Sequence, residues 1–347
     1  MLFDLRPKEE TKDFFNYKEE LDFFVNHLKD KKRRMIVIRG LRRTGKSSLL
    51  RVGLNKARVK FVLIDVRELT SLSRKSFEAK LLEELKSLKG IPATLLEKIE
   101  SIEAGVRISL KNEEDVWKLL KKLSPAIAVD EVQMLKGTGV ETFFAAVYDN
   151  TNCKIILTGS EVGVLDLFIG KDDPKAPLFG RAYDEIKMYS LNSEKSKEFL
   201  KLGFKEVKKA VSQEIMDKAL KELDDIIGWL TMFGNLSLSL NPNKALKKAM
   251  VDGVRMAYSE FESFLYRRPA AKKRYIKLCE ILAGKDMKWS DLKRALQIEL
   301  KERISDSQFT NYLNSLIEYG FIVHIGDTYS VPDPLLKRAL TGSMSSS

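Results

Sequence analysis

One octapeptide constrains the fold of this chain more than any other feature, because it fits the pattern G-x-x-x-x-G-K-[ST] between an apolar run and a helical stretch. It comprises Gly40, Leu41, Arg42, Arg43, Thr44, Gly45, Lys46 and Ser47, and Ser48 opens the helical stretch that follows. The glycines let the backbone curl so that several N–H groups point at one phosphate, and the amino end of the helix adds partial positive charge. The pattern predicts a loop that binds the phosphates of a nucleotide, and Ser48 is counted among its binding residues.

Two residues of this loop carry the predicted phosphate chemistry. Lys46 is expected to supply a point charge to the β- and γ-phosphates, and the Ser47 hydroxyl to be a ligand of Mg²⁺. Arg42 and Arg43 lie inside the loop, and we assign them a supporting electrostatic role. The alternative interpretation is a glycine-bearing turn with a chance lysine. The strand before the loop and the helix after it argue against that interpretation.

Four short apolar runs and a fifth segment, residues 185–189, predict the strands of a parallel sheet in the first half of the chain. They cover residues 35–38, 61–64, 126–129, 154–157 and 185–189. Stretches with helical spacing, such as residues 77–85, lie between them, so right-handed strand-helix-strand units are expected. The predicted fold class is therefore α/β, with the parallel sheet of a P-loop NTPase over residues 1–190.

Two acidic residues end the third of these runs. Asp130 and Glu131 follow a buried strand, at the edge where ligands of open α/β sheets gather. Asp130 is expected to hold Mg²⁺, and Glu131 to polarise the water that attacks the γ-phosphate. A solvated acidic strand end is the alternative interpretation.

Two further segments are candidates for contacts with the γ-phosphate. Thr158 and Ser160 end the fourth run, which is typical of a nucleotide sensor, although Thr-Gly-Ser is also common turn chemistry. Arg181 precedes the fifth run and could reach developing negative charge as an arginine finger. A surface salt bridge is the alternative for Arg181.

The second half of the chain has a different pattern. After Leu191 the strand runs stop, and amphipathic helices such as 196–204 and 215–227 predict a helical lid domain over residues 191–266. We assign residues 267–341 to a third domain and residues 342–347 to a disordered tail.

The third domain has the pattern of a winged helix. One helix ends near Gly284, another begins at Trp289, and a third is opened by a capping box of Ser305 and Gln308. Two short strands follow at residues 321–325 and 328–331, and the intervening pair Gly326-Asp327 predicts a tight turn.

The rare residue types exclude several other chemistries. The chain of 347 residues contains only His27 and His324, which argues against a histidine-rich zinc site or a Ser-His-Asp triad. Cys153 and Cys279 have no neighbour at metal-ligand spacing, and we interpret both as core residues. No window approaches eighteen consecutive apolar residues and no signal-peptide pattern is present, so we expect a cytoplasmic protein with no membrane partner.

Taken together, these segments resemble the archaeal ATPase family, a branch of the AAA+-like signal-transduction ATPases with numerous domains. The resemblance spans nearly the whole chain, and it rests on residues 1–7, 39–50, 129–133, 157–163, 177–181, 228–230 and 333–336. It implies an AAA+-like nucleotide domain, a helical lid, a C-terminal winged helix, and ATP or ADP with Mg²⁺ as ligands. It also implies that Arg181 occupies the position of the family's arginine, and that Glu161 belongs to the sensor segment.

The expected function is that of an ATP-hydrolysing molecular switch, in which the nucleotide state is coupled to the winged helix. The alternatives are a DNA-binding ATPase or remodeller and a nucleotide-dependent scaffold. The partner is open, and a protein partner or a homo-oligomer would both fit.

The distribution of charge bears on the DNA-binding alternative. The chain has a formal net charge of +12, and residues 266–347 carry 14 Lys and Arg against 9 Asp and Glu, which favours DNA. The predicted third helix, residues 305–319, contains no Lys or Arg, however. A helix that reads a DNA groove normally has phosphate-neutralising cations nearby, so this segment argues instead for a solvated face or a protein-docking module.

Overall fold

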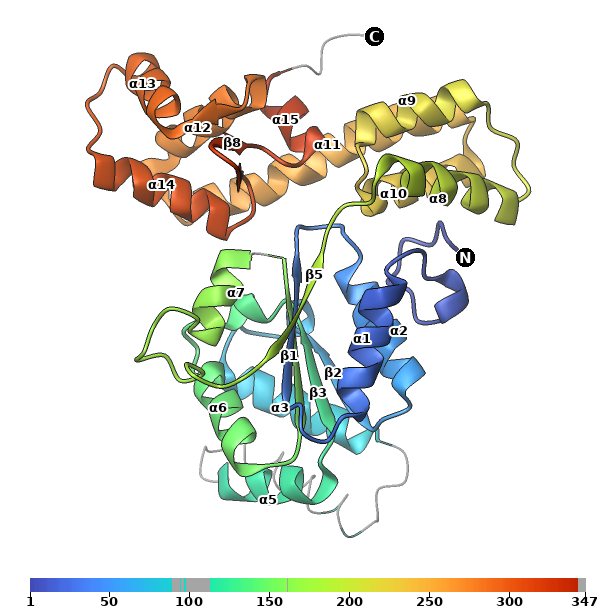
Figure 1. The fold of residues 1–347 in the computed structure, drawn as a ribbon, viewed down its shortest axis with the longest axis vertical. Helices are drawn as coiled ribbons and strands as arrows, with labels where there is room; N and C mark the ends of the chain where they lie inside the picture. Colours follow the sequence, from blue (N-terminus) through green and yellow to red (C-terminus); the bar gives the residue numbers. More distant parts are fainter. Residues whose placement is uncertain (89–93, 95–96, 98–112, 161, 343–347) are drawn as a thin grey trace. The chain divides into compact units, whose positions relative to one another are not determined.

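The computed structural model describes residues 1–88, 94, 97, 113–160 and 162–342 (Figure 1). Its contacts divide the chain into two compact units. The first, here called the sheet unit, contains Pro7–Leu41 and Gly45–Tyr189. The second, here called the C-terminal unit, contains Met1–Arg6, Arg42–Thr44 and Ser190–Ser347. Three residues of the predicted phosphate loop therefore group with the C-terminal unit.

The sheet unit is built on five parallel strands in the order β2-β3-β4-β1-β5. Their bounds are β1 (Met35–Gly40), β2 (Phe61–Asp65), β3 (Ala126–Asp130), β4 (Lys154–Gly159) and β5 (Asp184–Met188). Each lies on one of the five predicted runs, which confirms the α/β class and the parallel sheet. Because β2 and β3 are neighbours in register, Asp65 at the end of one strand pairs with Asp130 at the end of the other.

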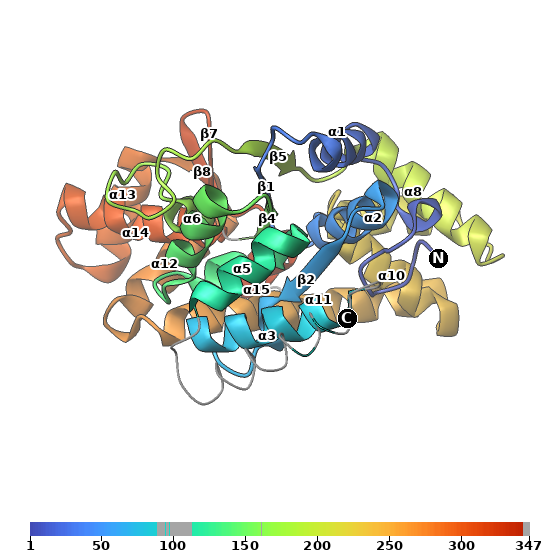
Figure 2. The same cartoon turned by 90° about the horizontal axis from the view of Figure 1, so that it is seen from below.

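Helices cover both faces of this sheet, as Figures 1 and 2 show. They are α1 (Lys18–Lys29), α2 (Lys46–Ala57), α3 (Arg74–Lys86), α5 (Glu113–Leu123), α6 (Val140–Asn150) and α7 (Val162–Ile169). Alternate residues of the central strands, such as Ile127, Val129, Ile155 and Leu157, share one core with α3, α5, α6 and α7. Helix α2 contacts β1 and β4, and α1 packs on α2. The alternation follows from the period of two along a strand.

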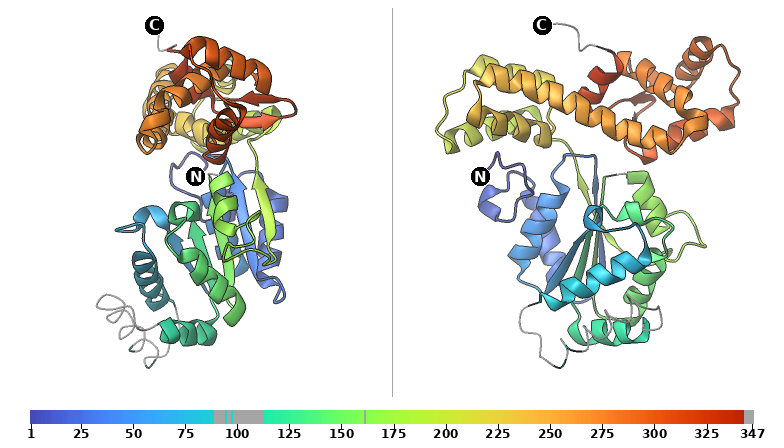
Figure 3. Two further views of the ribbon diagram at one scale, coloured as in Figure 1. Left: turned by 90° about the vertical axis from the view of Figure 1, so that its left-hand side faces the viewer. Right: turned by 180° about the vertical axis from the view of Figure 1, so that it is seen from behind.

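The C-terminal unit is mostly helical, and its 25-residue helix α11 connects one group of helices to the next (Figure 3). Its elements are α8 (Ser193–Glu206), α9 (Gln213–Leu223), α10 (Ile227–Ser239), α11 (Pro242–Tyr266), α12 (Lys272–Gly284), β6 (Met287–Lys288), α13 (Trp289–Leu300), α14 (Asp306–Glu318), β7 (Val323–Ile325), β8 (Thr328–Ser330) and α15 (Pro334–Leu340). The amino-terminal Phe3 belongs to this unit, where its buried ring packs against Gly203 and Gly234.

The winged-helix pattern is confirmed in its details. Helices α12 to α14 are followed by a hairpin in which Ile325 pairs with Thr328, which leaves Gly326 and Asp327 as the two-residue turn. The capping box at the start of α14 is formed by Ser305 and Gln308 as predicted. The strand β6, which the sequence did not predict, adds a third strand through β8.

One predicted helix extends too far. The helical spacing of residues 215–227 continues across a break, because α9 ends at Leu223 and α10 begins only at Ile227. Between them Asp224 has a φ of 55° and a ψ of −165°, a conformation that a helix does not contain. The short helix α15 was not predicted either, and it begins at Pro334 behind the capping residue Asp333.

Several expectations concern the chain as a whole. The domain boundaries at residues 190 and 266 stay a prediction, and most of the expected tail lies outside the described residues. Cys153 and Cys279 are both buried free thiols, which agrees with their interpretation as core residues. Within the described ranges, no helix is both long enough and apolar enough to cross a membrane.

Candidate functional site

The predicted phosphate loop lies where β1 passes into α2. A side chain at Gly40 could not be accommodated, because a Cβ atom there would lie 2.2 Å from the carbonyl oxygen of Met188 in β5. Gly45 has a φ of 97° and directly precedes α2, which begins at Lys46. The buried ammonium of Lys46 donates to the carbonyl oxygen of Leu41 at 2.6 Å. The loop thus curls around a lysine at the amino end of a helix, an arrangement suited to an anion.

Ser47 and Asp130, the two predicted magnesium ligands, are in direct contact. The Ser47 hydroxyl donates to Asp130 Oδ2 at 2.6 Å, and the hydroxyl of Thr158 donates to the other carboxylate oxygen. Asp130 is almost fully buried, so its charge is held at the strand edge by these donors. A carboxylate and a hydroxyl are the hard oxygen donors that Mg²⁺ prefers, and the residues present therefore fit the metal.

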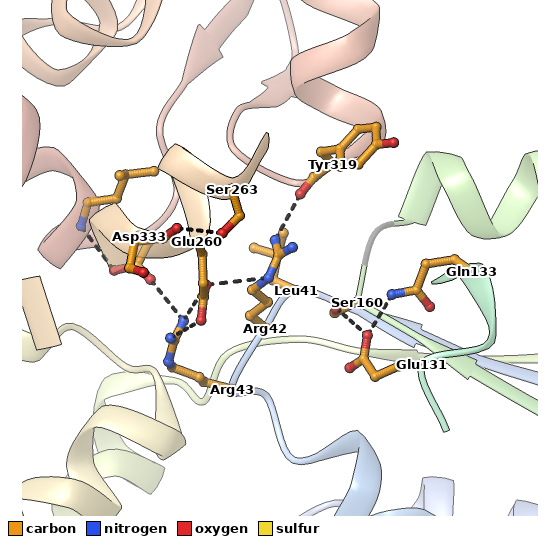
Figure 4. Close-up of polar contacts among 12 residues, drawn as sticks. Leu41, Arg42, Arg43, Glu131, Gln133, Ser160, Glu260, Ser263, Tyr319 and Asp333 are labelled. Atoms are coloured by element: carbon orange, nitrogen blue, oxygen red, sulfur yellow. Dashed lines mark hydrogen bonds and ion pairs between the residues drawn. The ribbon is translucent and has the colours of Figure 1, made fainter. Parts of the chain in front are cut away.

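Glu131 is held in an unusual backbone conformation by its neighbours. Its φ of 58° is uncommon for a residue other than glycine. Its backbone N–H donates to Thr158 Oγ1 at 3.4 Å, and its side-chain Oε2 accepts from Ser160 at 2.7 Å and from Gln133 at 2.6 Å (Figure 4). The candidate sensor residues Thr158 and Ser160 thus contact the two acidic residues. Glu161 lies outside the described residues.

Arg67 is a residue of this site that the sequence analysis missed. It lies in the short 3-10 helix η2 (Val66–Glu68) directly after β2. Its Nε donates to Asp65 Oδ1 at 2.8 Å and its Nη2 to Asp65 Oδ2 at 2.6 Å, while Nη2 lies 3.5 Å from Asp130 Oδ2. Burial raises the pKa of the Asp65 carboxyl, but the bonds from Arg67 outweigh it and the pKa is lower than usual. The available signal was the pair Asp65 and Arg67 at the end of a predicted strand.

Arg39 is a second residue that the sequence analysis missed. It is the last residue of β1 before Gly40, and its side chain is buried. Its guanidinium forms ion pairs with Asp166 of α7 at 2.6 Å and with Glu185 of β5 at 2.5 Å. A charged residue directly after a predicted buried strand was the available signal, since a buried charge needs partners. Arg39 therefore connects β1 with α7 and β5 next to the loop.

Arg42 and Arg43 both have side-chain contacts within the C-terminal unit (Figure 4). Arg42 donates to the carbonyl oxygen of Tyr319 at 2.9 Å and lies 3.4 Å from Glu260 of α11. Arg43 forms an ion pair with Glu260 as well, and its Nη1 lies 3.7 Å from Asp333.

The main chain and the guanidinium of Arg43 both contact helix α10. The Arg43 guanidinium carbon lies 4.0 Å from the centre of the Trp229 ring, a cation–π contact. The Arg43 carbonyl oxygen accepts from the N–H of Gly228 at 3.0 Å. Thr44, which has the same unit assignment, is buried. The inner part of the loop is thus packed on the C-terminal unit.

Two other predicted site residues have different surroundings. Ser48 Oγ accepts from the backbone N–H of Lys8 at 3.0 Å, so its hydroxyl holds the segment before α1. Arg181 is paired with Asp149, with Nε to Oδ1 at 3.0 Å. Asp149 lies in the last turn of α6, shortly before β4 begins, and Arg181 precedes β5, so the pair lies at the amino edge of these parallel strands. The phosphate loop follows the carboxyl end of β1, and the structure does not bring Arg181 to it.

Comparison with known proteins identifies an ATPase domain followed by a winged helix. A family model described as an ATPase domain predominantly from Archaea matches residues 14–232, and a model of the MCM protein C-terminal winged helix-turn-helix domain matches residues 269–331. No protein of curated function matches the chain.

The comparison with solved structures finds the Walker-type ATPase PABY2304 of Pyrococcus abyssi, which is 31% identical with a TM-score of 0.81 and aligns over 98% of this chain and 99% of that one. The Holliday junction branch migration motor RuvB of Thermotoga maritima is 13% identical (TM-score 0.46; 94% and 95% of the two chains). Domain III of the replication initiation protein DnaA of Thermotoga maritima is 17% identical (TM-score 0.46; 72% and 96%). The first family model covers well over half of the sequence, and the Pyrococcus protein is similar along nearly its whole length. This chain therefore belongs to the family of ATPase domains found predominantly in Archaea.

Proposed function

We propose that this protein is a Mg²⁺-dependent ATPase of the cytoplasm whose nucleotide state is coupled to its winged helix. The loop residues Lys46 and Ser47 would bind the phosphates and the metal, together with Asp130. Mg²⁺, when bound with ATP, would neutralise charge on the β- and γ-phosphates. Glu131 would orient the attacking water and accept its proton, with its carboxylate positioned by Ser160.

The coupling part of this proposal depends on one observation. Residues Arg42–Thr44 group with the C-terminal unit, whereas Gly40 and Gly45 on either side group with the sheet unit. A change in the curvature of the loop on nucleotide binding would therefore act on the ion pairs of Arg43 with Glu260 and Asp333. Conversely, a partner that moves these carboxylates would alter the loop, because coupling between two sites is reciprocal.

Phosphate release from ATP tests the catalytic assignment. Lys46→Ala should abolish measurable ATP binding, because it removes the buried cation of the loop. Glu131→Gln should bind ATP with unchanged affinity and hydrolyse it about 10²- to 10⁴-fold more slowly, since it removes a general base. ATP turnover that persists in the double variant would exclude this site. Tight ADP binding by the wild-type protein without any phosphate release would instead indicate a nucleotide-dependent scaffold.

DNA binding by the winged helix is a second candidate, favoured by the exposed cations Arg267, Lys272 and Lys273 at the start of α12 and just before it. Other basic residues of this region already have acidic partners, such as Lys293 with Asp306 and Lys288 with Asp327. DNA affinity that falls steeply with salt, with stimulation of ATP hydrolysis by DNA, would support this function. Absence of both would leave a protein partner as the better proposal.

Arg181 is proposed to act on the nucleotide of a neighbouring copy. Its partner Asp149 is half exposed, so exchanging this ion pair for one across a subunit interface would cost little. Light scattering with and without ATP tests this role, which requires an ATP-dependent oligomer. A particle that stays monomeric while hydrolysing ATP at an unchanged rate over a range of protein concentrations would exclude it.

A further inference from the structure

Arg67 occupies a position at the candidate site that its neighbours define in detail. Its backbone N–H donates to Asp65 Oδ1 at 3.0 Å, in addition to the two side-chain bonds from Nε and Nη2 to the Asp65 carboxylate. Three bonds to one carboxylate hold the guanidinium directly after β2. The register of β2 against β3 then brings it to Asp130, whose Oδ2 also accepts from Ser47. Arg67 thus lies next to the predicted metal ligands through the strand order alone.

The way in which Arg67 is bound leaves part of its donor capacity for another group. An arginine has five N–H donors in a planar fork. Asp65 binds the side of the fork formed by Nε and Nη2, so the end of the fork, with one N–H from each Nη, faces away from Asp65. The side chain is 53% exposed, whereas the Asp130 side chain beside it is 3% exposed. The end of the guanidinium fork matches the bidentate geometry of a phosphate.

We propose that Arg67 binds the terminal phosphate of ATP within its own chain and makes the site discriminate ATP from ADP. The inference rests on the proposed function, because it assumes a triphosphate at the phosphate loop. Asp65 is the positioning residue, since it fixes the guanidinium beside Asp130. Three carboxylates, those of Asp65, Asp130 and Glu131, end β2 and β3 or follow them directly, and a phosphate would be repelled there without a cation.

The competing explanation is that Arg67 serves only as a counter-charge for Asp130. The two explanations differ in which nucleotide they affect. A counter-charge would alter ATP and ADP affinity by the same factor, or would strengthen Mg²⁺ binding when removed. A group that binds the terminal phosphate affects ATP alone, because ADP lacks that phosphate.

Calorimetric titration of the full-length protein with Mg·ATP and with Mg·ADP separates these explanations. Arg67→Ala should weaken ATP binding about 10- to 100-fold and ADP binding less than about threefold, as expected for one charge-assisted pair. Arg67→Lys should fall between the wild type and the alanine variant, since it keeps the charge but not the fork. Asp65→Asn should also reduce the preference for ATP over ADP, because it removes the carboxylate that positions Arg67.

Lys60→Ala is the matched control, because Lys60 is an exposed cation just before the opposite end of β2. It should leave both dissociation constants unchanged. Equal losses for ATP and ADP in Arg67→Ala, no loss, or tighter ATP binding would each overturn the inference. A wild-type protein that binds neither nucleotide would refute the proposed function itself. Thermal unfolding of each variant shows whether it is folded, and Arg67→Lys provides the comparison if Arg67→Ala is not.

Discussion

Replacing Arg43 with methionine tests whether the phosphate loop is anchored to the C-terminal unit. Methionine keeps most of the length of the side chain and removes the guanidinium. The Arg43 side chain is 14% exposed, stacks on Trp229 at 4.0 Å and faces two carboxylates, Glu260 and Asp333. The Glu260 side chain is 35% exposed, so its ion pair with Arg43 contributes little to the free energy of unfolding. The contacts with Trp229 and Asp333 are better shielded from water.

The magnitude follows from these two shielded contacts. A partly desolvated cation–π contact is worth about 1–2 kcal/mol. Loss of the cation beside Asp333, whose side chain is 21% exposed, adds part of the 3–5 kcal/mol that breaking a fully buried pair costs. We therefore expect Arg43→Met to lower the free energy of unfolding of the C-terminal unit by about 2–4 kcal/mol.

The loss of stability caused by Arg43→Met should also depend on pH. Burial raises the pKa of Asp333 above its usual value of 3.8, and Arg43 opposes this rise. Without Arg43 the pKa of Asp333 in the folded state rises further. A carboxyl whose pKa is raised in the folded state destabilises that state when it is ionised. This destabilisation is absent at a pH below the pKa of the unfolded state and complete at a pH above the pKa of the folded state. The destabilisation by Arg43→Met should therefore be larger at pH 8 than at pH 4.

Urea unfolding followed by tryptophan fluorescence and circular dichroism measures this effect. Arg267→Met, the same change at an exposed position of the same unit, should alter stability by less than about 0.5 kcal/mol. Asp333→Asn should recover part of the loss in the Arg43→Met background, because asparagine keeps the cap of α15 and carries no charge. A loss that is equal at both pH values and unaffected by Asp333→Asn would refute the electrostatic part of this reasoning.

Two further predictions concern other buried contacts. Gly228→Ala would place a Cβ atom 2.5 Å from Cβ of Arg43, so it should lower the free energy of unfolding by about 1–3 kcal/mol and weaken ATP binding. The control is Gly284→Ala, which should be neutral or stabilising because the space around Gly284 is open. Burial lowers the pKa of His27 below 6.5, although the hydrogen bond with Asp184 opposes the change. Neutral His27 therefore contributes its full stabilisation of the folded state above pH 6.5, and this contribution is lost as the pH falls through the lowered pKa. His27→Asn should therefore flatten the decrease of the melting temperature between pH 7.5 and pH 5, and an unchanged slope would show that His27 does not contribute.

The predictions from sequence succeeded where the chemistry is local. The phosphate loop, the strand before it and the helix after it are adjacent in the chain, so motif and periodicity report on the same structure. The strand that ends at Asp130 was predicted for the same reason, and the roles of Asp130 and Glu131 stay predictions. The expected helix over residues 215–227 failed because the spacing of apolar residues persists through Asp224, where the backbone leaves the helical region.

Other features could not be found without the fold. Arg67 lies beside Asp130 only because β2 and β3 are neighbours, and no local pattern states the order of the strands. The acidic partners of Arg43 lie more than two hundred residues further along the chain, in α11 and before α15. Arg181 was a candidate for either an arginine finger or a surface salt bridge, and only the fold shows that within its own chain it pairs with Asp149, at the amino edge of the strands.

By itself, the sequence of this protein determined the type of chemistry, because a phosphate loop and two acids at a strand end need only local backbone geometry. The tertiary structure alone decided which carboxylates the arginines contact. An arginine can extend in many directions, and its partner depends on which carboxylate the folded chain brings within a few ångströms. That choice directs Arg67 toward Asp65 and Asp130, Arg43 toward the C-terminal unit, and Arg181 toward Asp149.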